Sequence, residues 1–474
     1  MKKGLIILVH IFGILLVLFG VGLQPSAAEE GKTKFTGELE KNAVIRVLEN
    51  DTAIKQGYLS ELLEAFNEEY KEYGIVARDA NMDQYSDLEN DGPYGYGPDV
   101  LYQANDRLMR YVDGKHIQPL PVEDLETFQV LNDSAWDPFQ SVVNGKEYTF
   151  AVPVNIQGPL LYYRKDLLPE NWETEYDENG NGVPDMIESW NHLYNFSKER
   201  IEEGKWGYMR SFLEPYFSIG YLYSYGGYAF GNNDTDDTDI GFSKGNSELG
   251  ASVIRQLAGI MDERCIDDTI TVTAYSQLAK GNFFATITTP DVYTLFIDQM
   301  IAEGMSKKEA VDNLGIADIP LLPKSGDLSE TITDWDSQLM SSIMMGGIQG
   351  YAISSYTKYP NASLAFIDFA TKYEMIYRRN ELLGIAPARF DVAEAVGGLS
   401  EIINKNLTSG LISVMPSIRA TAQIWTPLQT FFQDVAKDPF RTGSQSSKYT
   451  SLEAFKKELE KVDKQIYDAI HTLN

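Results

Sequence analysis

The sequence predicts an α/β protein with two globular lobes. Its 474 residues exceed what a single hydrophobic core normally holds. Strand-like runs alternate with stretches of helical hydrophobic spacing, which is typical of α/β lobes with largely parallel sheets. Apolar residues make up 43% of the chain and aromatic residues 12%, enough to fill two cores, so global disorder is excluded.

The first 28 residues have the pattern of an export signal. Met1-Lys2-Lys3 precedes an apolar run at residues 4–23, and the small residues Ser26-Ala27-Ala28 follow. This order predicts cleavage after Ala28 and a periplasmic, extracellular or cell-surface protein. The alternative is an uncleaved anchor, since about 20 apolar residues can span a bilayer. The only cysteine, Cys265, lies far from the signal, so we expect no lipid anchor.

Charge and cysteine content restrict the partners and the means of stabilisation. The formal net charge is −29, so nucleic acid and anionic lipid surfaces are repelled and are not expected as partners. A single cysteine cannot form an internal disulfide, so stability must come from the cores and from a bound metal, if there is one.

The first elements follow a polar segment. Residues 29–42 lack hydrophobic periodicity and are expected to be a disordered leader. The apolar run at 44–48 predicts a strand, and the Gly-Pro-Asp turn at 97–99 predicts a buried strand at 100–102. Between these strands, helical spacing is shown by Leu59, Leu62, Leu63 and Phe66.

The later elements continue the alternation. Residues 148–154 and 159–163 are rich in strand formers and are separated by 155–158, which we interpret as a crossing between lobes. Residues 284–289 and 348–353 are also strand-like. A final helix is predicted by the shared face of Leu452, Phe455, Leu459, Val462, Ile466 and Ile470.

Residues 177–188 match the pattern of a calcium-binding loop. Such a loop supplies oxygen ligands from positions 1, 3, 5, 7, 9 and 12 and needs glycine at position 6. Those ligand positions are Asp177, Asn179, Asn181, the Val183 carbonyl, Asp185 and Glu188, and Gly182 is at position 6. The pattern predicts a solitary structural Ca²⁺ site. The alternative is a surface turn rich in asparagine and glycine.

Several segments, in a fixed order, resemble the maltose-binding protein family of extracellular solute-binding proteins from about residue 43 to the end. They are Gly97-Pro98-Asp99-Val100 leading to Asp106-Arg107, Val152-Pro153-Val154 followed by residues 163–169, Glu214-Pro215-Tyr216-Phe217 followed by residues 226–230, and Val414-Met415-Pro416 followed by Trp425. The resemblance implies two α/β lobes joined by crossing strands, with a hinge and a ligand cleft between the lobes.

The resemblance also implies where each lobe begins and ends. The N-terminal lobe would comprise residues 43–155 and 341–386, and the C-terminal lobe residues 156–340 and 387–474. The chain would cross between them near Asn155, near residues 340–346 and near Gly384 to Pro387.

The resemblance implies a set of sugar-binding residues. Aromatic rings stack on sugar rings, and charged or amide groups bond the hydroxyls. Asp106 and Arg107 match a pair that bonds sugar hydroxyls, Glu214 matches a further acceptor, and Tyr216 and Trp425 match stacking rings.

Four positions depart from the maltose-binding pattern. Gln103 and Asp291 occupy places where the pattern has tryptophan, Gln157 replaces a glutamate and Gln429 replaces an arginine. Amides bond hydroxyls as carboxylates do, so a sugar is still expected, although maltose itself is less favoured. Residues 49–51, Glu-Asn-Asp, are further candidate acceptors.

The function implied is that of a carbohydrate-binding receptor that delivers a maltodextrin-like oligosaccharide to the membrane permease of an ABC importer. We expect a monomer, no organic cofactor and no enzymatic activity. The alternatives are a sugar-sensing subunit, a receptor for a non-sugar solute and a glycoside hydrolase. Carboxylate pairs are expected by chance among 69 acidic residues, and no catalytic motif singles out a pair.

Overall fold

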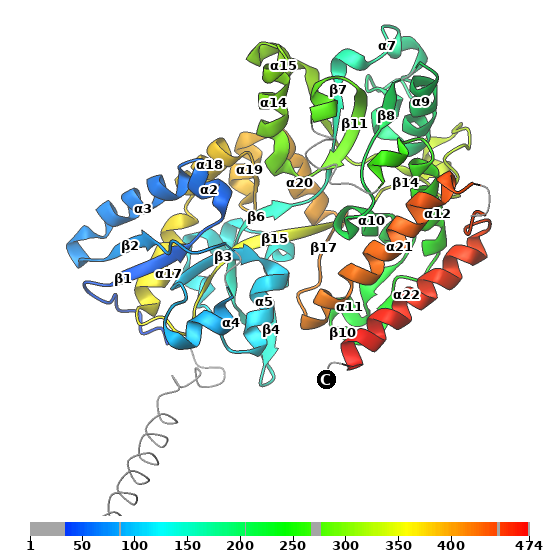
Figure 1. Cartoon of the computed structure of the whole chain (residues 1–474). Helices are drawn as coiled ribbons and strands as arrows, with labels where there is room; N and C mark the ends of the chain where they lie inside the picture. Colours follow the sequence, from blue (N-terminus) through cyan, green and yellow to red (C-terminus); the bar gives the residue numbers. More distant parts are fainter. Residues whose placement is uncertain (1–33, 85–86, 204, 267–275, 443–445, 473–474) are drawn as a thin grey trace, which may run out of the picture.

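Two mixed β-sheets, one in each lobe, organise the chain (Figure 1). The computed structural model describes residues 34–84, 87–203, 205–266, 276–442 and 446–472. The predicted signal segment, residues 1–28, lies outside the described residues. Within the described ranges, none of the helices combines the length and hydrophobicity that a membrane span requires.

The larger sheet forms the first lobe. Its strand order is β16 (Ala386–Pro387), β6 (Ala151–Gln157), β15 (Met344–Ile353), β3 (Val100–Ala104), β1 (Val44–Leu48) and β2 (Val76–Asp79), with β17 (Ile412–Val414) beside β15. The β1 and β3 strands fall where the sequence predicts them. Six of the seven residues of β6 are buried, which explains its nearly continuous apolar run.

Helices and a hairpin surround this sheet. The α3 helix (Tyr58–Glu69) buries Leu59, Leu62 and Phe66, as the periodicity predicts, and the Phe66 ring packs on Phe366 with centroids 5.1 Å apart. The other elements of this lobe are α2 (Asp51–Lys55), α4 (Leu88–Asp91), α5 (Asn105–Asp113), α6 (Asp133–Trp136), the hairpin β4 (Gln140–Val143) and β5 (Lys146–Thr149), α17 (Pro360–Ala370) and α18 (Tyr373–Leu383).

The expected disordered leader is wrong for residues 34–42, which pack on the start of α17. The Glu40 carboxylate accepts the Asn361 N–H at 3.0 Å and the Ala362 N–H at 2.8 Å. In return, the Asn361 side-chain oxygen accepts the Thr36 and Gly37 N–H groups, each at 3.1 Å. A carboxylate at a helix N-terminus satisfies free N–H groups and the helix dipole, so this polar segment is ordered without hydrophobic periodicity.

The second lobe combines a smaller sheet with a layer of helices. The sheet order is β12 (Leu314–Ala317), β7 (Leu160–Arg164), β11 (Phe283–Thr288) and β8 (Trp206–Tyr208). Around this sheet lie α7 (Trp172–Glu175), α8 (Asp185–Glu188), α9 (Trp190–Glu202), α14 (Tyr293–Ala302), α15 (Lys307–Asn313), α16 (Trp335–Gln338) and the hairpin β13 (Leu322–Pro323) and β14 (Leu339–Met340).

The helical layer of the second lobe includes the final predicted helix, α22 (Leu452–Thr472). Its predicted apolar face is buried from Phe455 to Ile470, whereas Leu452 at its first position is exposed. It contacts α12 (Ser247–Ala258) and α21 (Trp425–Lys437). The remaining elements of the layer are α10 (Pro215–Ser224), the hairpin β9 (Tyr228–Phe230) and β10 (Asp236–Gly241), and α11 (Gly231–Asp234).

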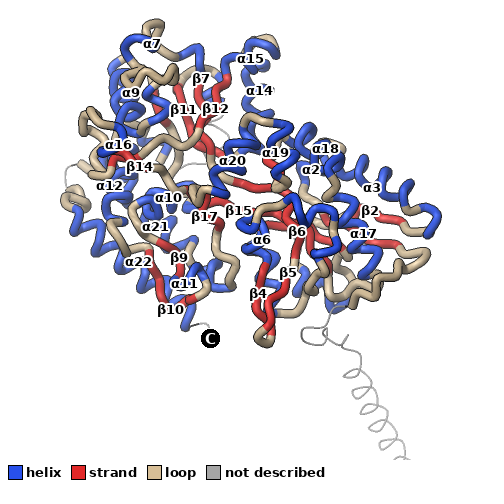
Figure 2. The backbone as a smooth tube through the Cα atoms, turned by 180° about the vertical axis from the view of Figure 1, so that it is seen from behind, coloured by secondary structure: helices blue, strands red, loops and turns tan. Residues whose placement is uncertain are grey.

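The two sheets are linked at the places where the chain changes lobes. After β6 the chain passes through Gly158 and Pro159 into β7, and it returns to the large sheet at β15 (Figures 1 and 2). Gly158 and Gly346 allow close approach here: a Cβ on Gly346 would lie 2.6 Å from the Gln157 carbonyl oxygen, and one on Gly158 would lie 2.5 Å from Ile412.

The last passage between the lobes falls later than the predicted boundary at 387. After β16, α19 (Phe390–Val396) contacts α18, and α20 (Leu399–Thr408) contacts β6, β16 and α6 of the first lobe. The β17 strand then pairs with β15, and only α21 packs on the helices of the second lobe.

The prediction of largely parallel sheets is wrong. In the large sheet β15 runs antiparallel to β3 and β6, and in the small sheet β7 runs antiparallel to β11 and β12. The antiparallel pairs involve the strands that enter or leave a lobe. A buried strand is apolar on both faces in either orientation, so its sequence does not specify its direction.

Candidate ligand-binding site between the lobes

The first lobe contributes the N-terminus of α5 to the site. The β3 strand leads directly into α5, so Asp106 and Arg107 lie in the first helical turn, both partly buried. Burial raises the pKa of Asp106, while the N–H and the charge of Arg107 and the charge of Arg110 act in the opposite direction. A carboxylate in this position is a hydrogen-bond acceptor partly shielded from water.

Asn105, which sequence reasoning missed, fixes this helix start to the neighbouring segments. Its side chain is fully buried, and its amide donates to the Met415 carbonyl oxygen and the Ser417 hydroxyl, each at 2.8 Å. Its side-chain oxygen accepts the Ile348 N–H at 3.2 Å. Three segments distant in sequence are thereby joined. No local pattern indicates such a contact in advance.

Tyr216 brings the second lobe to the same place. It lies in the first turn of α10, and its hydroxyl donates to the Gln157 carbonyl oxygen, 3.4 Å away, at the end of β6. Burial raises the pKa of the Tyr216 phenol, and the charges of Asp291 and Asp106 raise it further. These two carboxylates come from opposite lobes, and both lie close enough for their charges to act on the Tyr216 phenol.

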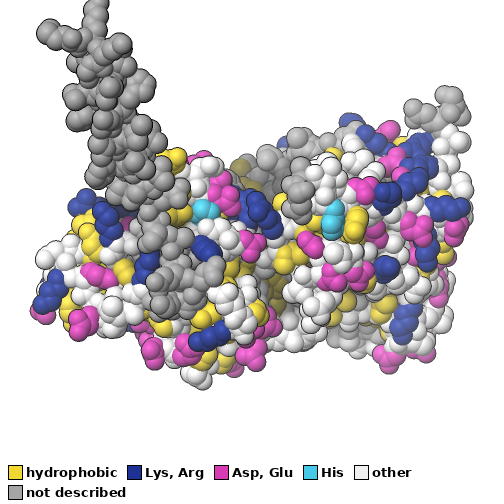
Figure 3. All heavy atoms as spheres, turned by 90° about the horizontal axis from the view of Figure 1, so that it is seen from below, with side chains coloured by type: hydrophobic (Ala, Val, Ile, Leu, Met, Phe, Trp, Pro, Cys, Tyr) yellow, Lys and Arg dark blue, Asp and Glu magenta, His cyan; other side chains and the backbone are white. Residues whose placement is uncertain are grey.

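The structure thus gathers four of the predicted residues where the lobes meet: Asp106, Gln157, Tyr216 and Asp291. Asp291 is exposed in the short 3₁₀ segment Pro290–Val292 that follows β11. The molecular surface is hollowed between the two lobes, and acidic side chains are spread over both lobes of this face (Figure 3). An aromatic ring and carboxylates at the junction of the lobes can offer a polar ligand both a flat face and hydrogen-bond acceptors.

Glu214 precedes α10 and is held by a residue that sequence reasoning also missed. The Arg210 side chain, only 3% exposed, donates to the Glu214 carboxylate. The Arg210 guanidinium carbon lies 3.7 Å from the centre of the Phe217 ring. The spacing of four residues between Arg210 and Glu214 is the signal that could have revealed this pair.

Trp425 and Gln429 share a face of α21. Trp425 is the first residue of the helix and packs partly on the core, and Gln429, one turn later, is exposed. Gln103, by contrast, is only 7% exposed in β3, and its amide donates to the Gln84 carbonyl oxygen. Of these three predicted residues, Gln103 has the least surface for a ligand.

Two of the three candidate acceptors at 49–51, Glu49 and Asn50, serve the fold. Both Glu49 oxygens bond the Arg379 guanidinium, at 2.8 and 3.0 Å, and Glu49 is fully buried. The Asn50 side chain accepts the Ala53 N–H at 2.7 Å and thereby caps α2. Treating Glu49 as a free acceptor is therefore wrong, because a buried ion pair and a buried hydroxyl, that of Tyr351, already occupy its oxygens.

The two α/β lobes, their crossing strands and the polar and aromatic side chains between them define the architecture of a two-lobed solute-binding protein. The model of the family described as bacterial extracellular solute-binding protein matches residues 61–406, and the chain belongs to this family. The family suggested by the sequence motifs and the predicted fold class are confirmed.

Curated relatives and solved structures agree with this assignment. The chain is 25% identical over 446 residues to the maltodextrin-binding protein MdxE of Bacillus subtilis, covering 92% of this chain and 93% of the relative. It is 24% identical over 394 residues to the galactooligosaccharide-binding protein of the same organism, covering 81% and 82%. The structure of MalX from Streptococcus pneumoniae in complex with maltopentaose has a TM-score of 0.67 at 19% identity, covering 90% of this chain and 99% of that one.

Proposed function

We propose that this protein is an extracytoplasmic receptor that binds an oligosaccharide of the maltodextrin type between its lobes and delivers it to the permease of an ABC importer. The observation that carries the proposal is the meeting of Asp106, Gln157, Tyr216 and Asp291 at the junction of the lobes. They come from both lobes and from a crossing strand, so a ligand bound to all of them would stabilise the conformation in which the two lobes are closed on it.

The chemistry of these residues suits a neutral polyhydroxyl ligand. The Tyr216 phenol can donate as well as accept hydrogen bonds, and burial, which raises its pKa, favours this protonated form; its ring offers an apolar face. The Asp106 and Asp291 carboxylates accept hydrogen bonds from sugar hydroxyls. We assign Trp425 as a second stacking ring and Arg107, Glu214, Gln103, Gln157 and Gln429 as polar contacts.

A galactooligosaccharide is the second candidate ligand. A relative that is 24% identical over 394 residues bears that name, and this chain departs from the maltose-binding pattern at Gln103, Gln157, Asp291 and Gln429. Polar groups in place of stacking rings change which hydroxyl positions are favoured, and the site can thus discriminate between sugars of similar size.

We further propose that the protein binds its sugar without turnover and acts after export and removal of residues 1–28. Incubation of the purified protein with oligosaccharides, followed by chromatography of the products, tests the first point. Appearance of shorter sugars would contradict it.

Calorimetric titration with maltotetraose, a cyclodextrin and a galactooligosaccharide tests the binding proposal. Tyr216→Ala should lower the affinity for the bound sugar about tenfold or more, because a stacked ring contributes both buried area and ring contact. Asp113→Asn, at the exposed far end of α5, is the matched control and should leave the affinity unchanged. Solution scattering should show a smaller radius of gyration with sugar bound. Failure to bind any of these oligosaccharides would refute the proposal.

A further inference from the structure

The loop at residues 177–188 has a definite conformation in the structure. It begins just after the short helix α7 and its last four residues form α8, and Gly180 and Gly182 have φ values of 69° and 79°. The Asp177 carboxylate accepts the Asn181 and Gly182 N–H groups, each at 3.0 Å. The Asp177 side chain, at position 1, thereby fixes the backbone at positions 5 and 6. Gly182, at position 6, makes the sharp turn that the sequence pattern requires.

Three side chains of the loop, those of Asn179, Asn181 and Glu188, meet at a common centre. The Asn181 amide nitrogen lies 2.9 and 3.0 Å from the two Glu188 carboxylate oxygens, and the Asn179 amide nitrogen lies 3.1 Å from one of them. Asp177 borders the same turn through its bonds to the backbone. The side-chain oxygens of Asn179 and Asn181 accept the N–H groups of Asn181 and Val183, at 3.0 and 2.8 Å, and each has a second lone pair with which it can bind a cation.

Asp185, at position 9, supplies an independent observation. Its side chain is fully buried, and one carboxylate oxygen accepts the Glu178 N–H of the loop at 2.9 Å. The other oxygen, Oδ1, has no hydrogen-bond partner among the described residues. Leaving a buried carboxylate oxygen without a partner is energetically unfavourable, and a bound cation would satisfy it.

We propose that this loop binds one Ca²⁺ ion through the side-chain oxygens of Asp177, Asn179, Asn181, Asp185 and Glu188 and the Val183 carbonyl oxygen. The set contains three carboxylates and only oxygen ligands. Ca²⁺ accepts six to eight such ligands in flexible geometry, whereas Mg²⁺ demands a near-ideal octahedron. The site is independent of the sugar-binding function proposed above.

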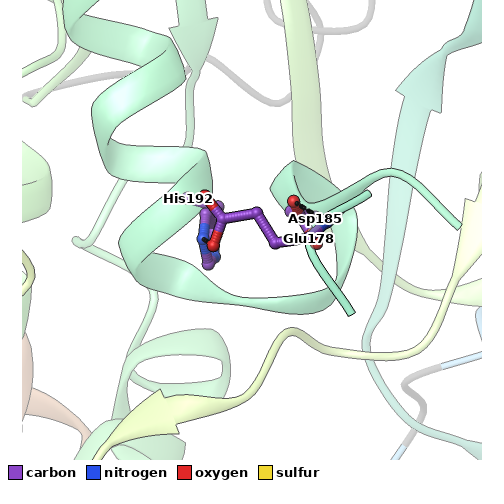
Figure 4. Close-up of side chains that lie close together, drawn as sticks. All are labelled: Glu178, Asp185 and His192. Atoms are coloured by element: carbon purple, nitrogen blue, oxygen red, sulfur yellow. Dashed lines mark hydrogen bonds and ion pairs between the residues drawn. The ribbon is translucent and has the colours of Figure 1, made fainter. Parts of the chain in front are cut away.

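A second arrangement of the same region competes for Asp185. Glu178, Asp185 and His192 each place one potential ligand atom within 4.8 Å of the others (Figure 4). A site that includes imidazole nitrogen would favour Zn²⁺ over Ca²⁺. We favour the oxygen loop because Glu178 is exposed and already lies 3.5 Å from the His192 ring nitrogen as an ion-pair partner.

The position of the loop indicates what the ion stabilises. The Glu188 carbonyl oxygen accepts the Leu321 N–H at 2.7 Å, which ties the end of the loop to the segment before β13. Val183, Ile187 and Glu188 also border a cavity of about 300 Å³, whose wall includes Ser341, Ser342 and Leu411 just before and beside β15. Calcium would therefore hold the second lobe together next to the return crossing.

Titration of the chelator-treated full-length mature protein with calcium chloride tests the proposal. We expect one ion to bind with a dissociation constant on the order of 10⁻⁴ to 10⁻³ M, as in extracellular calcium modules, and the melting temperature to rise at about 10 mM calcium. Magnesium should give a smaller shift. Glu188→Gln, which keeps the shape of the side chain but removes its charge, should abolish the calcium shift.

Three control variants separate the possible outcomes. Glu173→Gln, an exposed acid in the adjacent α7, and Glu178→Gln should keep the calcium shift, and His192→Asn should keep it too. Loss of the shift in Glu178→Gln or His192→Asn, with Zn²⁺ stabilising the wild type more than Ca²⁺, would assign the ion to the competing cluster. Absence of any calcium shift in the folded wild type, or its persistence in Glu188→Gln, would overturn the proposal.

Discussion

The buried ion pair between Glu49 and Arg379 should dominate the stability of the first lobe. Their side chains are 0% and 1% exposed, and the guanidinium makes two hydrogen bonds to the carboxylate at 2.8 and 3.0 Å. The guanidinium also lies over the rings of Tyr102 and Tyr58, at 4.3 and 4.8 Å from their centroids. We predict that Arg379→Met destabilises the protein by about 4 kcal/mol, within the range for a buried pair that loses one partner.

The magnitude follows from what remains around Glu49. In Arg379→Met the carboxylate keeps the Asn50 N–H at 2.9 Å and the Tyr351 hydroxyl at 2.5 Å, but it loses both bonds to the guanidinium. Each hydrogen bond to a charged group contributes about 1.5–3 kcal/mol, and the remaining charge stays buried without a counter-ion. Methionine fills much of the space between the two tyrosine rings, so the cavity contribution is small.

The neighbouring residue provides a matched control. Arg378 makes the same two-pronged contact with Glu61, at 2.8 and 3.0 Å, but the two side chains are 42% and 50% exposed. Arg378→Met should destabilise the protein far less than Arg379→Met, because exposed ion pairs contribute little to stability. Arg378 also bonds Glu381 at 3.2 Å, so the comparison contrasts a buried and an exposed arginine whose main ion pairs have the same two hydrogen-bond distances.

Urea denaturation followed by circular dichroism and tryptophan fluorescence measures these differences. Glu49→Leu alone should also be strongly destabilising, whereas the double variant with Arg379→Met should be far less destabilised than the sum of the two, with a coupling energy of about 3 kcal/mol. Equal losses for Arg378→Met and Arg379→Met, or additive losses in the double variant, would refute the reasoning.

Three further predictions concern pH and ligand affinity. Burial acts to raise the pKa of Asp438, but hydrogen bonds, first that from the Ser447 hydroxyl, lower it to about 2. The Asp438 carboxylate should therefore stabilise the folded protein by about 2 kcal/mol above pH 4. The wild type should melt at a higher temperature than Asp438→Asn above pH 4, and this difference should vanish as the pH falls toward 2. Burial raises the pKa of Asp463 to about 6, so the folded protein favours the protonated form of this side chain. The contribution of Asp463 to stability is therefore largest below pH 4 and is lost as the pH rises through 6. The melting temperature of the wild type relative to Asp463→Asn should therefore fall between pH 4 and 6, and a flat difference would contradict this. In sugar titrations, Trp425→Ala should weaken binding more than Gln103→Ala, because Gln103 is nearly buried and committed to Gln84; the reverse order would show that the stacking ring is elsewhere.

The sequence alone determined the α/β class, the family and most element positions. The apolar run at 44–48 and the spacing of Leu59, Leu62 and Phe66 appear in the structure as a strand and a helix, because local hydrophobic periodicity is set by which face each element buries. Motifs such as Glu214-Pro215-Tyr216-Phe217 identified the family, because several of them occur along this chain in the order that the maltose-binding protein family has.

Only the tertiary structure decided strand direction, lobe passages and the partners of buried polar groups. The antiparallel placement of β15 and the order of residues 34–42 depend on contacts with distant segments such as the start of α17. Glu49 reads as a free acceptor next to a turn, yet its partner is Arg379, 330 residues away. Contacts between residues so far apart produce no periodic pattern in the sequence, because the two partners come together only when the lobe folds.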